Sequence, residues 1–371
     1  MKTLNNFFQS LCKNLKTVFY VFIAASLIIT INSCSKDDNT DTPEDKTPDT
    51  DTSYTYSLSD CYGTWKRHSI ITSSSNNGFW IYGTIINSSA SSAVNLTLPF
   101  GNWDTTYTAM NPSMASNGVL TISNDPFSHT YMSYGKNLMV GTTKRDDSYT
   151  LVFDQRTSTS TTYSLADFEG RWYSHYIAGG GSWNGWVHAT SDIDNSGNCV
   201  VSDVVKSDVN GNVGNSAFNI SSDGTITVPG VPTYNGFMST DKSLMIANMT
   251  DGGGGGGIAI AQKAISGTTY SIADLKGTWQ LHDIIVGSEN WTEHGLITID
   301  NSGVGTLSNM IRDDNNTFNY LGAIPISITA DGIVTFDPDF HGFMSADKKL
   351  VVATKGDAAN AYSLVIIQKM P

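Results

Sequence analysis

The sequence contains three copies of one segment, and this triplication constrains the fold more than any other feature. The segment Tyr56–Asp60 recurs in related form from Tyr163 and from Tyr270, a spacing of 107 residues each time. A Met-Ser pair recurs in the same way, at Met132, Met238 and Met344. Each copy closes on an apolar stretch that ends in glutamine, at Gln155, Gln262 and Gln368. Because the landmarks stay in register from end to end, the chain is predicted to fold as three equivalent units.

Each copy also carries a Gly-x-Trp motif followed by a histidine three residues later. The tryptophans are Trp65, Trp172 and Trp279, and the histidines are His68, His175 and His282. One histidine per copy cannot supply the three or four ligands that zinc requires. His188 and His294 could join in two copies, and His129 and His341 in two, but no set is present in all three. We therefore interpret the repeated tryptophans and histidines as structural and expect no metal or cofactor.

Turn residues divide each copy into short extended runs. In the third copy the expected strands are Thr278–Val286, Glu293–Ile299, Val304–Arg312, Ile324–Thr329, Ile333–Asp337, His341–Ser345, Leu350–Thr354 and Tyr362–Gln368. Eight short strands in about 100 residues leave no room for a crossover helix and predict an antiparallel meander. A meander of this size tends to close into a barrel, because closure removes unpaired edges. The fold class is thus all-β, with three tandem eight-stranded barrels.

A Gly-x-Trp motif on the first strand, with an apolar last strand returning beside it, resembles the lipocalin-like superfamily. The resemblance implies that the tryptophan packs across the bottom of the barrel. These copies lack the length and the paired cysteines of typical secreted lipocalins. The alternative is a six-bladed β-propeller with two blades per copy, because Met344–Lys348 and the strand that follows resemble a propeller hairpin.

The amino terminus has the pattern of an export signal. Three lysines precede the apolar run Thr17–Ile31, which is shorter than the roughly 20 residues that span a bilayer. Ile31–Cys34 resembles the lipobox of bacterial lipoproteins, although Asn32 departs from the small residue usual at that position. The resemblance implies that residues 1–33 are removed and that Cys34 is lipidated. A plain secretory signal or a short membrane anchor is the alternative.

Residues 34–53 are rich in Asp, Thr and Pro and predict a solvated tether. Lys36-Asp37-Asp38 resembles the surface-export signal of lipoproteins from Bacteroidota-type bacteria. We therefore expect a lipid-anchored protein of the outer membrane, displayed on the cell surface. The expected repeats span 54–160, 161–267 and 268–371.

The net charge of −13 argues against nucleic-acid binding, because an acidic protein is repelled by the phosphate backbone. Cys61 and Cys199 lie at non-equivalent positions of two copies. We interpret Cys61 as a small buried hydrophobe and expect no disulfide framework.

Aromatic residues gather between the first and second expected strands of each copy, where the chain is rich in Gly, Ser and Asn. They are Phe79, Trp80, Tyr82, Trp183, Trp186 and Trp291. In a lipocalin-like barrel this loop overhangs the mouth, where the rings could stack on a sugar or cover an apolar ligand. They could equally fill their own barrel.

Three functions remain in view. The first is a non-catalytic surface binding module for a glycan or a small apolar ligand, with three barrels providing avidity. The second is a structural or adhesive spacer built from sealed barrels. The third, an enzyme, is disfavoured because no carboxylate pair or Ser/His/Asp grouping recurs at the same place in each copy.

Overall fold

The computed structural model describes residues 54–73, 79–89, 92–98, 101–107, 112–123, 125–180, 184–207, 214–250, 255–313, 322–356 and 360–371. Cys12, Cys34 and the expected signal and tether lie outside these ranges. Within them, no helix combines the length and the apolar character needed to cross a membrane.

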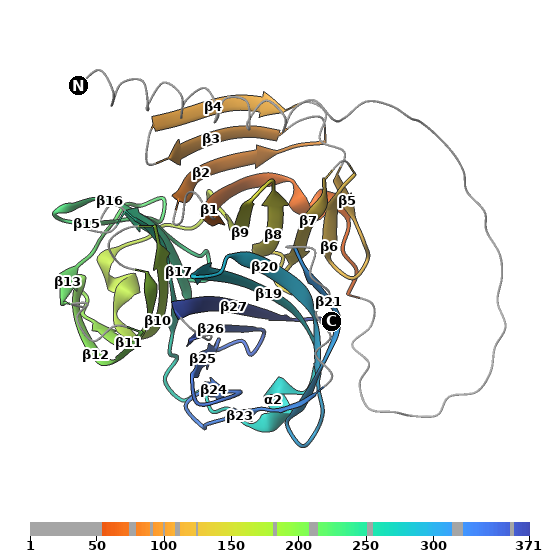
Figure 1. Cartoon of the computed structure of the whole chain (residues 1–371). Helices are drawn as coiled ribbons and strands as arrows, with labels where there is room; N and C mark the ends of the chain where they lie inside the picture. Colours follow the sequence, from red (N-terminus) through yellow and green to blue (C-terminus); the bar gives the residue numbers. More distant parts are fainter. Residues whose placement is uncertain are drawn as a thin grey trace, which may run out of the picture.

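The described residues form three antiparallel sheets, one from each copy, and each sheet lies against the other two (Figure 1). The first contains β1 Gly63–Ser73, β2 Phe79–Asn87, β3 Ser92–Leu98, β4 Gly101–Tyr107, β5 Pro112–Met114, β6 Val119–Ile122, β7 Asp125–Met132, β8 Leu138–Arg145 and β9 Ser148–Arg156. The second contains β10 Gly170–Gly179, β11 Gly185–Ile193, β12 Asn198–Lys206, β13 Ser216–Ala217, β14 Asn219–Ile220, β15 Thr225–Val228, β16 Val231–Met238, β17 Leu244–Thr250 and β18 Gly256–Lys263. The third contains β19 Gly277–Gly287, β20 Trp291–Ile299, β21 Val304–Arg312, β22 Ala323–Pro325, β23 Ser327–Ile328, β24 Ile333–Thr335, β25 Phe340–Met344, β26 Leu350–Gly356 and β27 Ala361–Lys369. Short helices η1 Leu58–Cys61, η2 Leu165–Phe168 and α2 Ile272–Leu275 precede the first strand of each sheet.

The three sheets share one strand order, in which the first strand pairs with the last. In the first sheet the order is β4-β3-β2-β1-β9-β8-β7-β6-β5. Because each sheet returns to its own first strand, the alternative of six separate propeller blades is wrong.

Each sheet has nine strands rather than the eight expected, and in the third sheet a single divided segment accounts for the difference. In the third sheet the expected strand Ile324–Thr329 is divided at Ile326: β22 pairs with β21, and β23 pairs with β24. The Ile326 side chain is buried in the interior of the sheet. Because one segment bonds in turn to strands on both sides, the sheet is nearly closed into a barrel.

A fully buried tryptophan anchors the interior of each sheet. Trp65, Trp172 and Trp279 each donate from Nε1 to the carbonyl oxygen four residues earlier, at 2.8, 2.7 and 2.6 Å. A cation from the last strand lies over each indole ring; these are Arg156, Lys263 and Lys369. An unpaired buried N–H would cost about 1–3 kcal/mol, so the short helix that supplies the carbonyl fixes the tryptophan in place.

The two landmarks that define the repeat contact each other in space. In the third sheet, Lys348 Nζ lies 3.0 Å from Asp274 Oδ1, and the ammonium also lies over the ring of Tyr270. Equivalent ion pairs join Lys136 to Asp60 and Lys242 to Asp167. The recurring Tyr-Ser-x-x-Asp and Met-Ser-x-x-Lys segments therefore recur because they bind one another.

A fourth apolar core lies between the sheets. Strands 1, 8 and 9 of each sheet turn one face toward their own interior and the other toward this shared core. Most of it is made of five triplets of equivalent residues: Ile70, Ile177 and Ile284; Leu138, Leu244 and Leu350; Val140, Ile246 and Val352; Leu151, Ile258 and Leu364; Phe153, Ile260 and Ile366. We call it the central core.

The sheets close into a ring around the central core. β1 and β2 pack on β17 and β18; β10 and β11 pack on β26 and β27; β19 and β20 pack on β8 and β9. We call these contacts the 1/2, 2/3 and 3/1 joints. The same strands are used in the same sense at each joint, so the arrangement has approximate threefold symmetry.

Truncating the central core should destabilise the whole chain. Ile366 is fully buried there, and Ile366→Ala is expected to lower the free energy of unfolding by about 2–5 kcal/mol, measured by urea denaturation. Ile265→Ala, at a position 46% exposed, is the matched control and should change it by less than about 0.5 kcal/mol. Equal effects of the two substitutions would contradict this assignment of the core.

Candidate functional site

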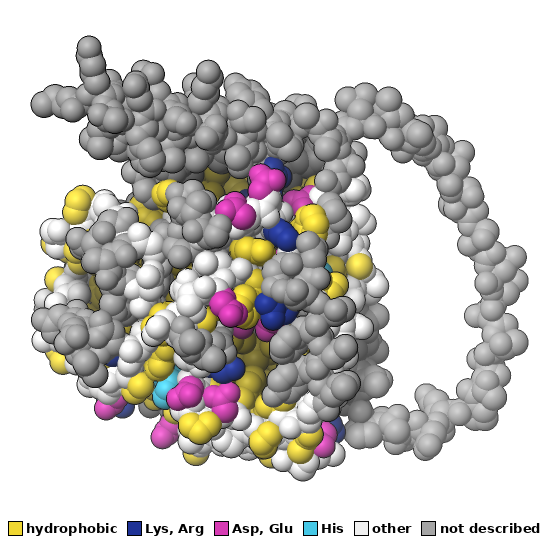
Figure 2. Space-filling model, viewed as in Figure 1, with side chains coloured by type: hydrophobic (Ala, Val, Ile, Leu, Met, Phe, Trp, Pro, Cys, Tyr) yellow, Lys and Arg dark blue, Asp and Glu magenta, His cyan; other side chains and the backbone are white. Residues whose placement is uncertain are grey.

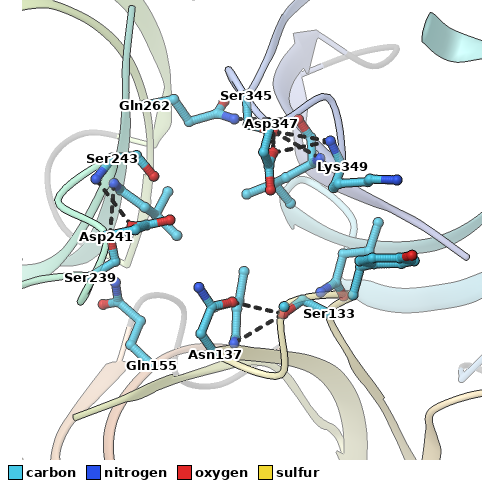
Figure 3. A pocket seen from close by; sticks show the side chains of 16 residues that line it. Ser133, Asn137, Gln155, Ser239, Asp241, Ser243, Gln262, Ser345, Asp347 and Lys349 are labelled. Carbon is cyan, nitrogen blue, oxygen red and sulfur yellow. Dashed lines mark hydrogen bonds between the residues drawn. The ribbon is translucent and has the colours of Figure 1, made fainter. Parts of the chain in front are cut away.

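A small polar pocket lies at one end of the central core, where the three sheets meet (Figure 3). Its cavity volume is about 50 Å³. Every sheet contributes the same positions to its wall: Ser133, Ser239 and Ser345; Asn137, Ser243 and Lys349; Leu138, Leu244 and Leu350; Gln155, Gln262 and Gln368. We call it the axial pocket.

The glutamines reach the pocket because of strand periodicity. Along β9, alternate side chains face the central core, first Leu151, then Phe153 and then Gln155. The equivalent strands β18 and β27 end the same stripe at Gln262 and Gln368. The apolar core therefore ends in a layer of three carboxamides, each in a residue only 1% exposed.

Two of the three carboxamides have no hydrogen-bond partner among the described residues. With its amide turned so that nitrogen faces an acceptor and oxygen a donor, Gln262 donates to the carbonyl oxygen of Phe343 at 3.1 Å and accepts from the N–H of Ser345 at 3.3 Å. In Gln155 and Gln368, both Nε2 and Oε1 are buried and unpaired. Buried polar groups are normally bonded. These two side chains therefore hold unused donors and acceptors beside a cavity that opens to solvent.

Tight turns between strands 7 and 8 form the rim of the pocket. Ser239 Oγ and the N–H of Ser243 both donate to Asp241 Oδ1. Ser345 Oγ donates to Asp347 Oδ1 in the same way, at 2.5 Å. Because these hydroxyls are held by their own turns, the buried glutamines are better placed than they are to bond a ligand.

The rim carries charges of both signs. Asp241, Asp347 and Lys349 all line the pocket, and the Lys349 ammonium is 4.2 Å from the ring centroid of Tyr134. Figure 2 likewise shows Lys, Arg, Asp and Glu side chains beside one another on the face in view. A mixed rim of this kind gives a fully ionic ligand of either sign little overall attraction.

The aromatics expected in a mouth loop lie on strands or at their starts. Trp80 is on β2, 3% exposed, and its Nε1 donates to Thr250 Oγ1 of β17 across the 1/2 joint at 2.9 Å. Trp186 is on β11, and its ring centroid lies 5.1 Å from that of His341 across the 2/3 joint. Both indoles therefore pack between sheets.

The other expected aromatics are placed differently. Phe79 begins β2 and is partly exposed, whereas Tyr82 faces His68 with ring centroids 5.1 Å apart. Trp291 begins β20, and the guanidinium carbon of Arg312 lies 4.0 Å from its ring centroid. Trp183 lies outside the described residues. Ligand binding through these six residues stays a prediction.

Cys61 and Cys199 are buried and free. Burial raises the pKa of the Cys61 thiol to about 12, so it stays protonated at neutral pH. In the described part of the chain, no three His, Cys, Asp or Glu side chains are placed to hold a metal ion.

A second hollow, of about 380 Å³, lies on the third sheet alone. Phe336 and Phe340 stack there with ring centroids 4.0 Å apart, and His341 lies at its edge. Its lining comes from one sheet, whereas all three sheets line the axial pocket.

No protein-family model matches the chain, and no curated protein sequence matches it. Among solved structures, the chain is similar to transferrin binding protein B from Neisseria meningitidis, with a TM-score of 0.27 and 10% identity over 79% of this chain. It covers 66% of that structure, just under two thirds of its length. Intact Ap-TbpB gives a TM-score of 0.25 with 9% identity, over 83% of this chain and 77% of that one. Kievitone hydratase from Nectria haematococca gives 0.16 with 10% identity, over 87% and 96%. Likenesses this weak support no functional assignment.

The unpaired carboxamides predict an unusual response to substitution. Gln368→Met keeps the volume but removes two buried groups that lack partners, so it should raise the free energy of unfolding by about 1–2 kcal/mol. Gln262→Met, the matched control, breaks two hydrogen bonds and should lower it by about 1 kcal/mol. Urea denaturation measures both, and a loss of stability in Gln368→Met as large as in Gln262→Met would contradict the assignment.

Proposed function

We propose that this protein is a non-catalytic, lipid-anchored surface protein that binds a hydroxyl-rich ligand, of the glycan class, at the axial pocket. The observation that carries the proposal is the pair of buried, unpaired carboxamides of Gln155 and Gln368. An unmade buried hydrogen bond costs about 1–3 kcal/mol, and a ligand that completes it recovers that cost.

The chemistry of the pocket favours hydroxyl groups over other ligands. A carboxamide can donate from its nitrogen and accept at its oxygen, which matches a hydroxyl group that does both. The cavity of about 50 Å³ holds a few water-sized groups, so it admits hydroxyl groups but is too small for a sugar ring. The ring of a bound sugar would lie at the rim, near Tyr134 and Lys349.

A structural spacer is the second candidate, and a specific observation favours it. The interiors of the three sheets are filled by their own side chains, among them Trp65, Trp172 and Trp279. In that case ordered water would satisfy the glutamines.

We also propose that the sheets are of the lipocalin-like type. The Gly-x-Trp tryptophan, bonded to the short helix that precedes the first strand, supports this proposal.

Binding can be tested with residues 35–371, which lack the expected signal and lipid cysteine. We expect binding to members of a glycan panel, measured by titration calorimetry on the best of them. Gln155→Met/Gln368→Met should weaken it at least tenfold, whereas Ile265→Ala should not change it. Binding that survives the double substitution, or silence across the panel, would favour the spacer.

The anchor is tested separately. Cys34→Ala in the full chain should abolish incorporation of labelled palmitate and move the protein out of the membrane fraction. Cys61→Ala, a buried thiol in the folded part, is the control and should leave both unchanged. Continued labelling of Cys34→Ala would overturn the proposed lipidation site.

A further inference from the structure

All seven histidines of the chain lie at the joints between sheets. His68 lies at the 1/2 joint; His175, His188 and His341 lie at the 2/3 joint; His129, His282 and His294 lie at the 3/1 joint. The central core holds the sheets together at the axis, and the histidines lie where the sheets meet around it.

At the 3/1 joint the histidines contact one another across the interface. His282 Nε2 of the third sheet lies 3.1 Å from His129 Nδ1 of the first. The rings of His129 and His294 stack at 4.0 Å, and His294 Nδ1 lies 3.2 Å from Thr142 Oγ1. His282 is fully buried, and its Nδ1 has no partner among the described residues.

The 2/3 joint repeats this arrangement at equivalent positions. His175 is fully buried, and its Nδ1 lies 3.4 Å from Thr354 Oγ1 of the third sheet. The His188 ring lies 4.9 Å from that of His175, and 5.7 Å from that of His341 across the joint. Two joints therefore each hold three imidazoles in contact.

The 1/2 joint has the same geometry but a single histidine. His68 Nδ1 lies 3.0 Å from Asn248 Oδ1, and Asn248 Nδ2 donates to the Ser69 carbonyl oxygen at 3.1 Å. Tyr82 occupies the position of His188 and His294, and Asn235 that of His129 and His341. The 1/2 joint, with one histidine, therefore serves as an internal control for the other two joints, which have three each.

Burial keeps these imidazoles neutral. Desolvation lowers the pKa of His129 and of His188 to about 4, and that of His68 and of His294 to about 3. Desolvation, and then the neighbouring histidines, hold the pKa of His175 and of His282 well below its usual range. Few charges oppose this effect. Asp203 faces His188, Asp337 and Asp339 face His341, and Lys66 adds to the repulsion at His68.

We propose that mild acid opens the ring of sheets, and that it opens first at the 2/3 and 3/1 joints. The three imidazoles at each of these joints can be neutral together but cannot be charged together at contact distance in a buried site. Opening the joint returns them to water, where each regains its ordinary affinity for a proton. The inference rests on the joints alone and does not depend on a ligand at the axial pocket.

The direction of the pH effect on stability follows from proton linkage. Each histidine has a folded pKa below its unfolded value of about 6.5, so its contribution to stability is fully present above that value and is lost as the pH falls. Below about pH 6, each one raises the opening constant by a factor that approaches tenfold per pH unit. A joint with three histidines therefore responds much more steeply than a joint with one.

Hydrogen exchange of residues 35–371, followed by mass spectrometry between pH 7.5 and 5, tests the proposal. The opening constant is the exchange rate corrected for the intrinsic pH dependence. Between about pH 6 and pH 5 it should rise by about a hundredfold or more per pH unit in the strands of the 2/3 and 3/1 joints, and by at most about tenfold at the 1/2 joint. Equal slopes at all three joints, or no rise, would overturn the proposal.

The 1/2 joint supplies the matched variant. His129→Asn/His294→Tyr places in the 3/1 joint the residue types that Asn235 and Tyr82 provide at the 1/2 joint. Its slope should fall to that of the 1/2 joint, while the 2/3 joint of the same molecule keeps its steep response. His188→Tyr/His341→Asn provides the reciprocal pair, and serves alone if the first variant does not fold at pH 7.5. An unchanged slope in a folded variant would contradict the role of the histidines.

Discussion

The structure depends on the central core, the apolar surface that strands 1, 8 and 9 of all three sheets share. Fifteen side chains from five equivalent triplets meet there, and residues such as Ile70, Leu151 and Ile366 are fully buried although they face away from the interior of their own sheet. Burial of this kind contributes about 25 cal/mol per Å² of apolar surface removed from water. A sheet separated from the other two would expose that face, so the unit that repeats in the sequence depends on its neighbours for stability.

Much of the fold could be predicted from the sequence, because hairpin turns and alternating side chains are local signals. The spacing of the landmarks predicts three equivalent units, and the strand pattern predicts an antiparallel meander that closes on itself. The number of strands differs because Ile326 divides a segment that changes partners, and hydrogen bonding of this kind leaves no mark in composition. The central core was missed, although Leu138-Met139-Val140 and its equivalents are apolar at consecutive positions. Such runs indicate a strand buried on both faces, one against its own interior and one against a neighbour.

The sequence carries a signal for the axial pocket in the three glutamines that also mark the end of each copy. Gln155, Gln262 and Gln368 follow two apolar residues at alternate positions, so they lie on the face that the central core buries. Which of them find partners depends on side-chain geometry, and the sequence cannot distinguish Gln262 from Gln155. The histidines show a similar limit. A structural role was predicted for His68, His175 and His282, but their partners belong to other sheets, and contacts between sheets are not encoded by local spacing.

The central claim is that the three sheets form one cooperative structure around a shared core. Differential scanning calorimetry of residues 35–371 at neutral pH tests it most directly. The account predicts a single transition in which the calorimetric enthalpy equals the van't Hoff enthalpy, since no sheet can unfold while the other two keep the core. Two or three resolved transitions, or a calorimetric enthalpy well above the van't Hoff value, would show that the sheets are independent and would contradict it.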